Sequence, residues 1–264
     1  MDKSGRKKIK PYSSDEALAL FIDTKLTKSQ YIKIRVQSKT RMADIYTSYH
    51  KIQAAKKACY PPDEAITITE ALMEVQLQAL LDLTIRRLVL SQKKVFTTMA
   101  NDISQELVLI SKWGYNFRDS DMFISSFVPL QLSSMSKSKN KLILWQNPRS
   151  SSVRYCRPIR LHFKKETTEL STQEIDNIQE QINNLQKTEV CVAGKTFFVT
   201  QQMALTMLDG KFCNAVTSTT SAQKCYICNA TPTKMNDLET VSARTVNESA
   251  YRFGFTIACV DKIF

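Results

Sequence analysis

The sequence predicts a mixed α+β fold, with a helical module first and a sheet-containing half after it. In residues 13–103, apolar side chains recur at the spacing of helices. From Leu107 onward, apolar residues come in short runs rich in branched and aromatic side chains, which is typical of strands. The chain has 264 residues, 43% of them hydrophobic, which is enough for one core and a smaller helical module.

A basic tail and short helices are expected at the start of the chain. Residues 1–12 are polar and basic, and we expect an unstructured tail there that can serve as a nuclear import signal. Ser13 or Ser14 can cap the first helix. A third helix is expected from about Ser48 to Cys59, because two successive prolines follow it and cannot continue a helix.

The second helix of this module is predicted to be basic. Thr27 as N-cap and Gln30 three residues later form a capping box. The residues expected to line its packed face are Tyr31, Ile34 and Ser38. The cations expected on and directly after it, which we assign to DNA contacts, are Lys28, Lys33, Arg35, Lys39 and Arg41.

The charge of the chain is concentrated in this region. Residues 1–60 carry fourteen lysines and arginines against five acidic residues, so they account for +9 of the formal charge of +12. A polyanion such as DNA is therefore the first partner to consider. No apolar stretch is long enough to span a bilayer, and seven scattered cysteines indicate reduced thiols. We expect an intracellular, nuclear protein that does not enter a membrane.

The middle and second half contain one long helical region and several strands. Residues 68–103 are expected to form one or two helices with a broad apolar stripe. A capping box at Ser171 to Glu174 is expected to open a later helix, and Ala193-Gly194 to turn a hairpin. The loop at 146–152 and its flank carry two further candidate phosphate contacts, Arg149 and Arg154.

Two motifs point to metals. Cys225 and Cys228 are spaced so that both thiolates can reach one zinc ion, but they are only half of a four-ligand site. Asp119 and Asp121 follow a predicted strand, where an acid of a two-magnesium site can lie, but no acids downstream are clearly paired with them, so a polar turn between strands is the favoured explanation. The histidines are isolated, and the dispersed glycines exclude a P-loop nucleotide hydrolase.

Four segments resemble one family. They are LTKSQYIKIR, the step Lys112-Trp113-Gly114, LWQNPRSSSVRYCRPIRLHFKKET and CYICNATPTKMND. Together they resemble the catalytic subunit of the V(D)J recombinase and the related Transib-type transposases, over roughly residues 15–250. The resemblance implies a dimerisation and DNA-binding module at 13–62, a helical connector at 63–104 and an RNase H-like core at 105–220. The CxxC half-site then lies in the remaining stretch, 221–264, where the core is expected to be incomplete.

The resemblance also implies a defective catalytic centre. The family's first catalytic acid ends the first core strand, at the position that Asn116 occupies here. An amide carries no charge and is a poor ligand for magnesium. We identify no counterparts of the family's later acids, nor of the two downstream histidines that complete its zinc site.

Three functions are therefore compatible with the sequence. The first is a transposase-derived, domesticated DNA-binding protein without catalytic activity, forming a homodimer as the resemblance implies. The second is an active, magnesium-dependent strand-nicking or strand-transfer enzyme of DNA recombination that uses Asp119 or Asp121. The third is a protein-interaction scaffold whose basic residues serve only for solvation.

Overall fold

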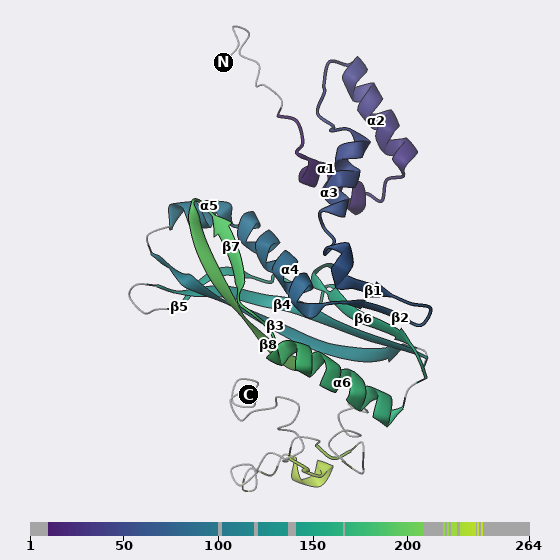
Figure 1. The fold of residues 1–264 in the computed structure, drawn as a ribbon, viewed down its shortest axis with the longest axis vertical. Helices are drawn as coiled ribbons and strands as arrows, with labels where there is room; N and C mark the ends of the chain where they lie inside the picture. Colours follow the sequence, from purple (N-terminus) through teal and green to yellow (C-terminus); the bar gives the residue numbers. More distant parts are fainter. Residues whose placement is uncertain are drawn as a thin grey trace. The chain divides into compact units, whose positions relative to one another are not determined.

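A computed structural model shows the chain as two compact units, residues 1–61 and 62–264. The structure describes residues 10–99, 102–118, 121–136, 141–165 and 167–207. Further along the chain it describes the positions 219, 221, 223–225, 228–235, 237 and 239. The fold is mixed α+β, as the sequence predicts (Figure 1).

Three helices make up the described part of unit 1. They are α1 (Ser14–Asp23), α2 (Lys28–Thr40) and α3 (Tyr49–Lys57). Each begins at a capping hydroxyl, and the capping box of Thr27 and Gln30 is confirmed. Ser48 caps α3, close to the predicted start of that helix. A small core holds the helices together, and its buried members are Ala17, Leu18, Tyr31, Ile52 and Ala55.

Unit 2 begins with a short hairpin that the sequence analysis did not anticipate. A 3-10 turn, η1 (Asp63–Ala65), leads into β1 (Ile66–Ile68) and β2 (Leu72–Val75), which pair antiparallel. The prediction of helix from residue 68 was therefore wrong over residues 68–75, because β2 gains a hydrogen-bonded neighbour in β6. The helical part consists of α4 (Leu77–Ser91) and α5 (Lys93–Thr98).

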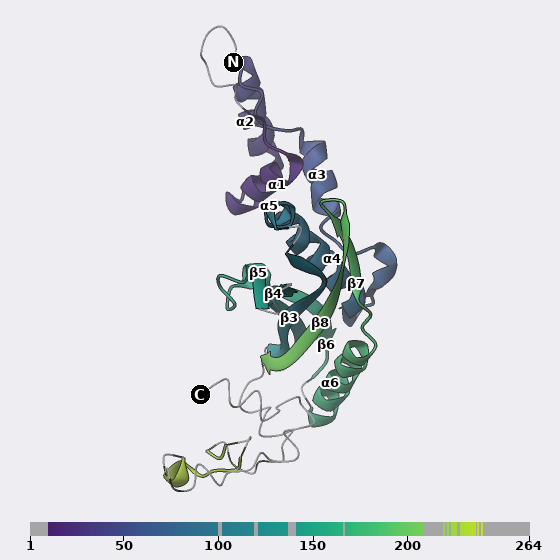
Figure 2. The same cartoon turned by 90° about the vertical axis from the view of Figure 1, so that its left-hand side faces the viewer.

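A curled eight-stranded sheet forms the centre of unit 2 (Figure 2). Its remaining strands are β3 (Ile103–Arg118), β4 (Met122–Ser136), β5 (Lys141–Gln146), β6 (Arg157–Phe163), β7 (Thr188–Val192) and β8 (Lys195–Met207). The order is β1-β2-β6-β4-β3-β8-β7, and β5 pairs with β4 beside β6. Neighbouring strands run antiparallel except β3 and β8, which are parallel. The predicted strands after Leu107 are thus confirmed.

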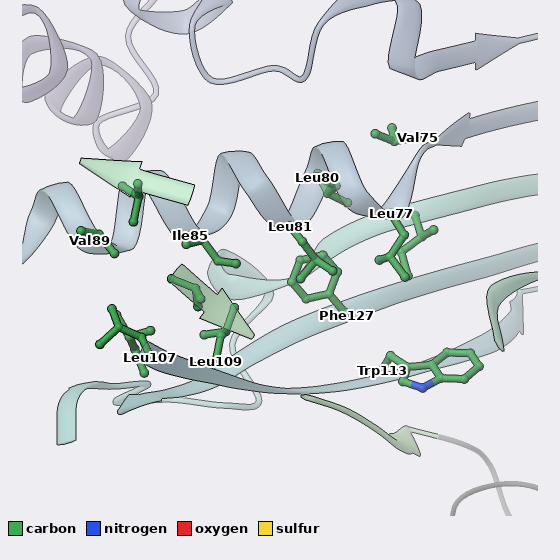
Figure 3. Close-up of a cluster of buried hydrophobic side chains, with 14 of the residues drawn as sticks. Val75, Leu77, Leu80, Leu81, Ile85, Val89, Leu107, Leu109, Trp113 and Phe127 are labelled. Atoms are coloured by element: carbon green, nitrogen blue, oxygen red, sulfur yellow. The ribbon is translucent and has the colours of Figure 1, made fainter. Parts of the chain in front are cut away.

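The main core lies between this sheet and two helices. Along α4, apolar side chains at helical spacing point toward the strands, where they meet Leu107, Leu109 and Phe127 (Figure 3). The fully buried side chains of α4 in this core include Leu77, Leu81, Ile85 and Val89. The second helix, α6 (Thr168–Asn183), adds Ile175 and Ile178 to the same core. It is tied to α4 because the Gln181 side chain accepts the Leu77 backbone N–H at 3.0 Å.

The start of α6 differs from the prediction. The N-cap is Thr167, whose hydroxyl accepts the Leu170 backbone N–H at 3.1 Å, so the helix begins before the predicted capping box. Ser171 and Glu174 lie inside the helix and are buried. The apolar stripe was predicted correctly, but the box was not, because Glu174 instead pairs with cations of β6.

The hairpin between β7 and β8 agrees with the sequence. Ala193 and Gly194 both have positive φ, 52° and 74°. Two successive residues with positive φ make the tight turn whose twist matches a two-residue hairpin. Among the described residues, no helix has the length and apolarity needed to cross a membrane.

Candidate nucleic-acid interface and metal half-site

The basic surface of unit 1 is carried by a helix that is mostly exposed. Tyr31 is the buried residue of α2, and its neighbours on the helix turn outward or are half-buried. Lys28, Lys33, Lys39 and Arg41 are exposed, whereas Arg35 is half-buried. Tyr31 therefore holds α2 to the core of unit 1, while Lys28, Lys33, Lys39 and Arg41 face solvent.

Three of these cations also have contacts within unit 1. The Arg35 Nε donates to the backbone oxygen of Tyr46 at 3.2 Å, which fixes the guanidinium. The Lys39 Nζ lies 3.3 Å from a carboxylate oxygen of Asp44, and the Lys28 Nζ lies 5.5 Å from the centre of the Tyr49 ring. Such exposed contacts are weak and leave both lysines able to meet a phosphate.

A cavity of about 410 Å³ lies beside α2 within unit 1. Arg35 and Lys51 supply its cations, and Asp44 its anion. The remaining lining residues are Pro11, Tyr12, Tyr46, Thr47 and Ser48. Lys51 was not among the predicted contacts. No local pattern points to Lys51, because the cavity is formed by residues from separate segments of unit 1.

Tyr31 joins the core of unit 1 to this surface. Its hydroxyl donates to the backbone oxygen of Thr47 at 2.9 Å. Burial raises the pKa of Tyr31, and the nearby Arg35 cation opposes that change. The phenol is therefore neutral at physiological pH and acts as a structural donor that positions the residues after α2.

The two remaining arginine candidates lie in unit 2. The loop between β5 and β6 exposes Arg149 and Arg154, as predicted. Asn147 accepts the Arg149 backbone N–H at 2.9 Å, and Ser152 accepts that of Arg154 at 3.3 Å. The neighbouring polar side chains thus shape the loop backbone, and both arginines are presented on its surface.

The candidate catalytic positions lie at the β3–β4 hairpin. Asn116 is exposed near the end of β3 and is paired with Ile124 of β4. Asp121 is exposed directly before β4, whereas Asp119 lies outside the described residues. Asp121 thus occupies a turn between two strands, which agrees with the explanation of this residue as part of a polar turn.

The parallel pairing of β3 and β8 draws attention to a further acid. Gly114 lies beside Met207, and a Cβ on Gly114 would collide with the Met207 backbone. Both strands run in the same direction, so β8 ends at Met207 close to the end of β3 that carries Asn116. Asp209 is two positions after β8 and lies outside the described residues. The sequence analysis did not consider it, because the pairing of distant strands is not visible in a local pattern.

The CxxC segment folds back on itself. The Cys225 backbone N–H donates to the Ala230 oxygen at 2.9 Å, and the Asn229 N–H donates to the Cys225 oxygen at 2.7 Å. Asn229 has a φ of 57°, so it supplies the left-handed residue of this turn. Both Cys225 and Cys228 are half-buried. Within the described residues no group of three or more metal-binding side chains occurs, so only the two thiolates of a zinc site are accounted for.

One charged cluster was missed by sequence reasoning. Glu174 of α6 is 3% exposed and lies between two residues of β6. Its carboxylate is 2.8 Å from the Nδ1 of His162 and 3.2 Å from the Nε of Arg160. Glu74 of β2 lies 3.9 Å from Arg160 and accepts from Gln181 at 3.0 Å. The cluster joins α6 to the sheet, so His162 has a structural partner.

No protein-family model matches the chain, and no curated protein matches it.

Proposed function

We propose that this protein is a DNA-binding protein descended from a transposase of the V(D)J recombinase type, without DNA-cleaving activity. The observation that carries the proposal is the exposed, cationic surface of α2, which a single buried residue anchors. Lysine and arginine side chains on a helix can neutralise phosphates and release counterions. Nuclear localisation follows from this role.

The fold supports the proposed ancestry. The antiparallel strands β3, β4 and β6 lie side by side, and the fourth long strand, β8, is parallel to β3 on the other side. This mixed sheet is the arrangement that we assign to an RNase H-like core. In the same proposal, the helices of residues 13–62 are the DNA-binding module and α4 and α5 belong to the connector.

The lack of catalysis rests on Asn116. In the proposed core, the first strand is β3, and its end carries an amide where a two-metal site needs a carboxylate. Magnesium prefers charged oxygen ligands, so the metal pair binds weakly there. The half-buried thiols of Cys225 and Cys228 are assigned to zinc as two of the four ligands that a structural site needs.

Exposed apolar side chains on α2 support a homodimer. Ile32 and Val36 lie one helical turn apart and are 40% and 47% exposed. Sedimentation analysis of the wild type and of Ile32→Asp/Val36→Asp tests this. A dimer that the double variant converts to a monomer supports pairing through α2, and a wild-type monomer at micromolar concentration contradicts it.

Duplex DNA binding across a salt series tests the main proposal. The test variant is Lys28→Gln/Lys33→Gln/Arg41→Gln, called the α2 triple. The matched control is Lys141→Gln/Lys164→Gln/Lys165→Gln, which removes the same charge from exposed positions of unit 2. Arg35 is left intact, because it bonds to the backbone of unit 1.

The salt dependence distinguishes phosphate contacts from a change in net charge. If three contacts are lost, the slope of log affinity against log salt becomes shallower by about 2.7 in the α2 triple. The control keeps nearly the wild-type slope. Wild-type affinity that does not change with salt, or equal losses in both variants, contradicts the proposal and favours an acidic protein partner.

A second candidate function is metal-dependent strand nicking. The specific observation in its favour is the parallel pairing of β3 and β8, which brings Met207 at the end of β8 beside Gly114, two residues before Asn116. The test incubates a hairpin substrate with magnesium or manganese. Nicking that Asp119→Ala or Asp121→Ala abolishes establishes an enzyme. Nicking seen only in Asn116→Asp indicates a core inactivated by that one amide.

A further inference from the structure

The cavity of about 410 Å³ in unit 1 combines cations with aromatic rings. Its cations are Arg35 of α2 and Lys51 of α3, and its tyrosines are Tyr12 and Tyr46. The volume lies within the range of about 300–1,000 Å³ that small-molecule sites occupy. Because these four residues line one cavity, a single ligand can meet positive charge and an aromatic ring together.

The charged residues that line this cavity favour an anion. They are two cations, Arg35 and Lys51, and one acid, Asp44. The acid has a partner of its own, because one of its carboxylate oxygens lies 3.3 Å from the Nζ of Lys39. Within the part of the chain that the structure describes, no acid forms an ion pair with Lys51. Positive charge that is concentrated in a concave site attracts anionic ligands.

The arginine and the outer tyrosine are held in position by contacts within unit 1. The Arg35 Nε donates to the Tyr46 backbone oxygen at 3.2 Å, and its two terminal nitrogens have no hydrogen bond to the other described residues. The Tyr12 backbone N–H donates to the Ile45 oxygen at 2.9 Å, and the Tyr12 ring lies with its centre 5.7 Å from that of Tyr46. Tyr46 in turn packs edge-on against the buried Tyr31. Ligand binding therefore orders few side chains and costs little conformational entropy.

Tyr12 offers an aromatic ring to the solvent, since this residue is 41% exposed. Proteins bind unpaired nucleotides with cations that meet the phosphate and aromatic rings on which the base stacks. In a duplex, each base lies within the stack and cannot be reached by such a ring. The combination of cations and an exposed ring therefore favours an unpaired nucleotide over a base-paired one.

We propose that this cavity binds an unpaired nucleotide of a DNA strand, with the phosphate at Arg35 and Lys51 and the base on the Tyr12 ring. The inference rests on the proposed DNA-binding function and extends it, because the exposed cations of α2 are assigned to duplex phosphates. Arg35 belongs to the same helix as those cations. One unit thus holds a duplex and an unpaired nucleotide of the same DNA.

The test measures binding of the full chain to single-stranded oligo(dT) across a salt series, and to free thymidine monophosphate. The variants are Lys51→Gln, Tyr12→Ala and Tyr12→Phe. The matched controls are Lys57→Gln, an exposed lysine of the same helix, and Tyr60→Ala, a tyrosine that is 55% exposed. Neither control residue lines the cavity. Circular dichroism verifies that each variant is folded before binding is measured.

We expect Lys51→Gln to make the slope of log affinity against log salt shallower by about 0.7 on oligo(dT), the contribution of one phosphate. Tyr12→Ala should weaken binding about 5- to 150-fold, the effect of one stacked base. Tyr12→Phe keeps the ring and should bind like the wild type, as should both controls. A loss in Lys51→Gln without one in Tyr12→Ala, or equal losses in Tyr12→Phe and Tyr12→Ala, would overturn the base contact and with it the proposal.

The same measurements separate this inference from the proposed function. If the wild type binds duplex DNA in a salt-sensitive way while the cavity variants bind oligo(dT) like the wild type, the inference fails and the proposed function stands. If the cavity variants lose oligo(dT) but the α2 triple binds duplex DNA like the wild type, the inference stands and the assignment of α2 fails. Thymidine monophosphate that binds as tightly as oligo(dT) would identify a free nucleotide as the ligand and overturn the assignment to a DNA strand.

Discussion

Two helices of this protein, α2 and α4, are anchored to their cores in different ways. Tyr31 is the buried residue of α2, whereas six residues of α4 are buried. The first helix is a lightly anchored surface, and the second is part of a core whose outer side is charged. Most sides of α2 are exposed, so its backbone is held by few contacts. One side of α4 is packed in the core, so its backbone is held by many contacts.

The largest expected effect is loss of a core side chain of α4. Leu81→Ala should lower the free energy of unfolding of unit 2 by about 2–5 kcal/mol, because it removes apolar burial and leaves a cavity. Urea denaturation followed by tryptophan fluorescence measures this, since Trp113 lies in the same core. Leu90→Ala, on the exposed side of α4, serves as the control. Equal losses in the two variants would show that α4 is not packed as described.

The buried carboxylate of α6 should rank next. Glu174→Gln removes the charge that faces Arg160 and His162, so we expect a loss of about 1–3 kcal/mol in unit 2. Glu180→Gln, an exposed change on the same helix, should stay within about 0.5 kcal/mol. A neutral effect of Glu174→Gln would mean that the cluster does not hold α6 on the sheet.

In unit 1, Tyr31→Phe tests the single anchor of α2. Loss of the hydrogen bond to the Thr47 oxygen should cost about 1 kcal/mol at neutral pH. Because the folded-state pKa of Tyr31 is raised, its contribution is present below the ordinary tyrosine value and is lost as pH rises through the folded-state pKa. Thermal unfolding between pH 8 and 11 should therefore show a difference from the wild type that shrinks at alkaline pH. A constant difference would contradict this.

The smallest effect is expected on the exposed part of α2. Ile34 is 39% exposed, although the sequence placed it on the packed face. Ile34→Ala should therefore change the stability of unit 1 by less than about 0.5 kcal/mol. Chemical denaturation of the purified protein provides the measurement. A loss above about 1.5 kcal/mol would mean that this face of α2 is covered in solution, which a dimer would explain.

Some features of the fold were accessible from the sequence because they depend on neighbours along the chain. The capping box of Thr27 and Gln30, the turn at Ala193-Gly194 and the strands after Leu107 each follow from local patterns, and each is confirmed. The predicted box at Ser171 failed, although its residue types were suitable. Thr167 supplies the cap, and tertiary ion pairs recruit Glu174 into the core.

The candidate site divides in the same way. The exposed cations of α2 and the CxxC turn were found by sequence, because spacing on a helix or in a turn is a local property. Lys51 at the cavity and the cluster around Glu174 were not, because each joins elements that are distant along the chain.

The sequence by itself determined where most helices and strands occur and that the first quarter of the chain is strongly basic. Only the tertiary structure decided that β8 lies parallel to β3, that residues 72–75 form a strand, and that Glu174 of α6 pairs with cations of β6. The physical reason is the separation along the chain over which each kind of interaction acts. Caps, turns and periodicity act within a few residues, whereas strand partners and the exposed side of a helix depend on what packs against it.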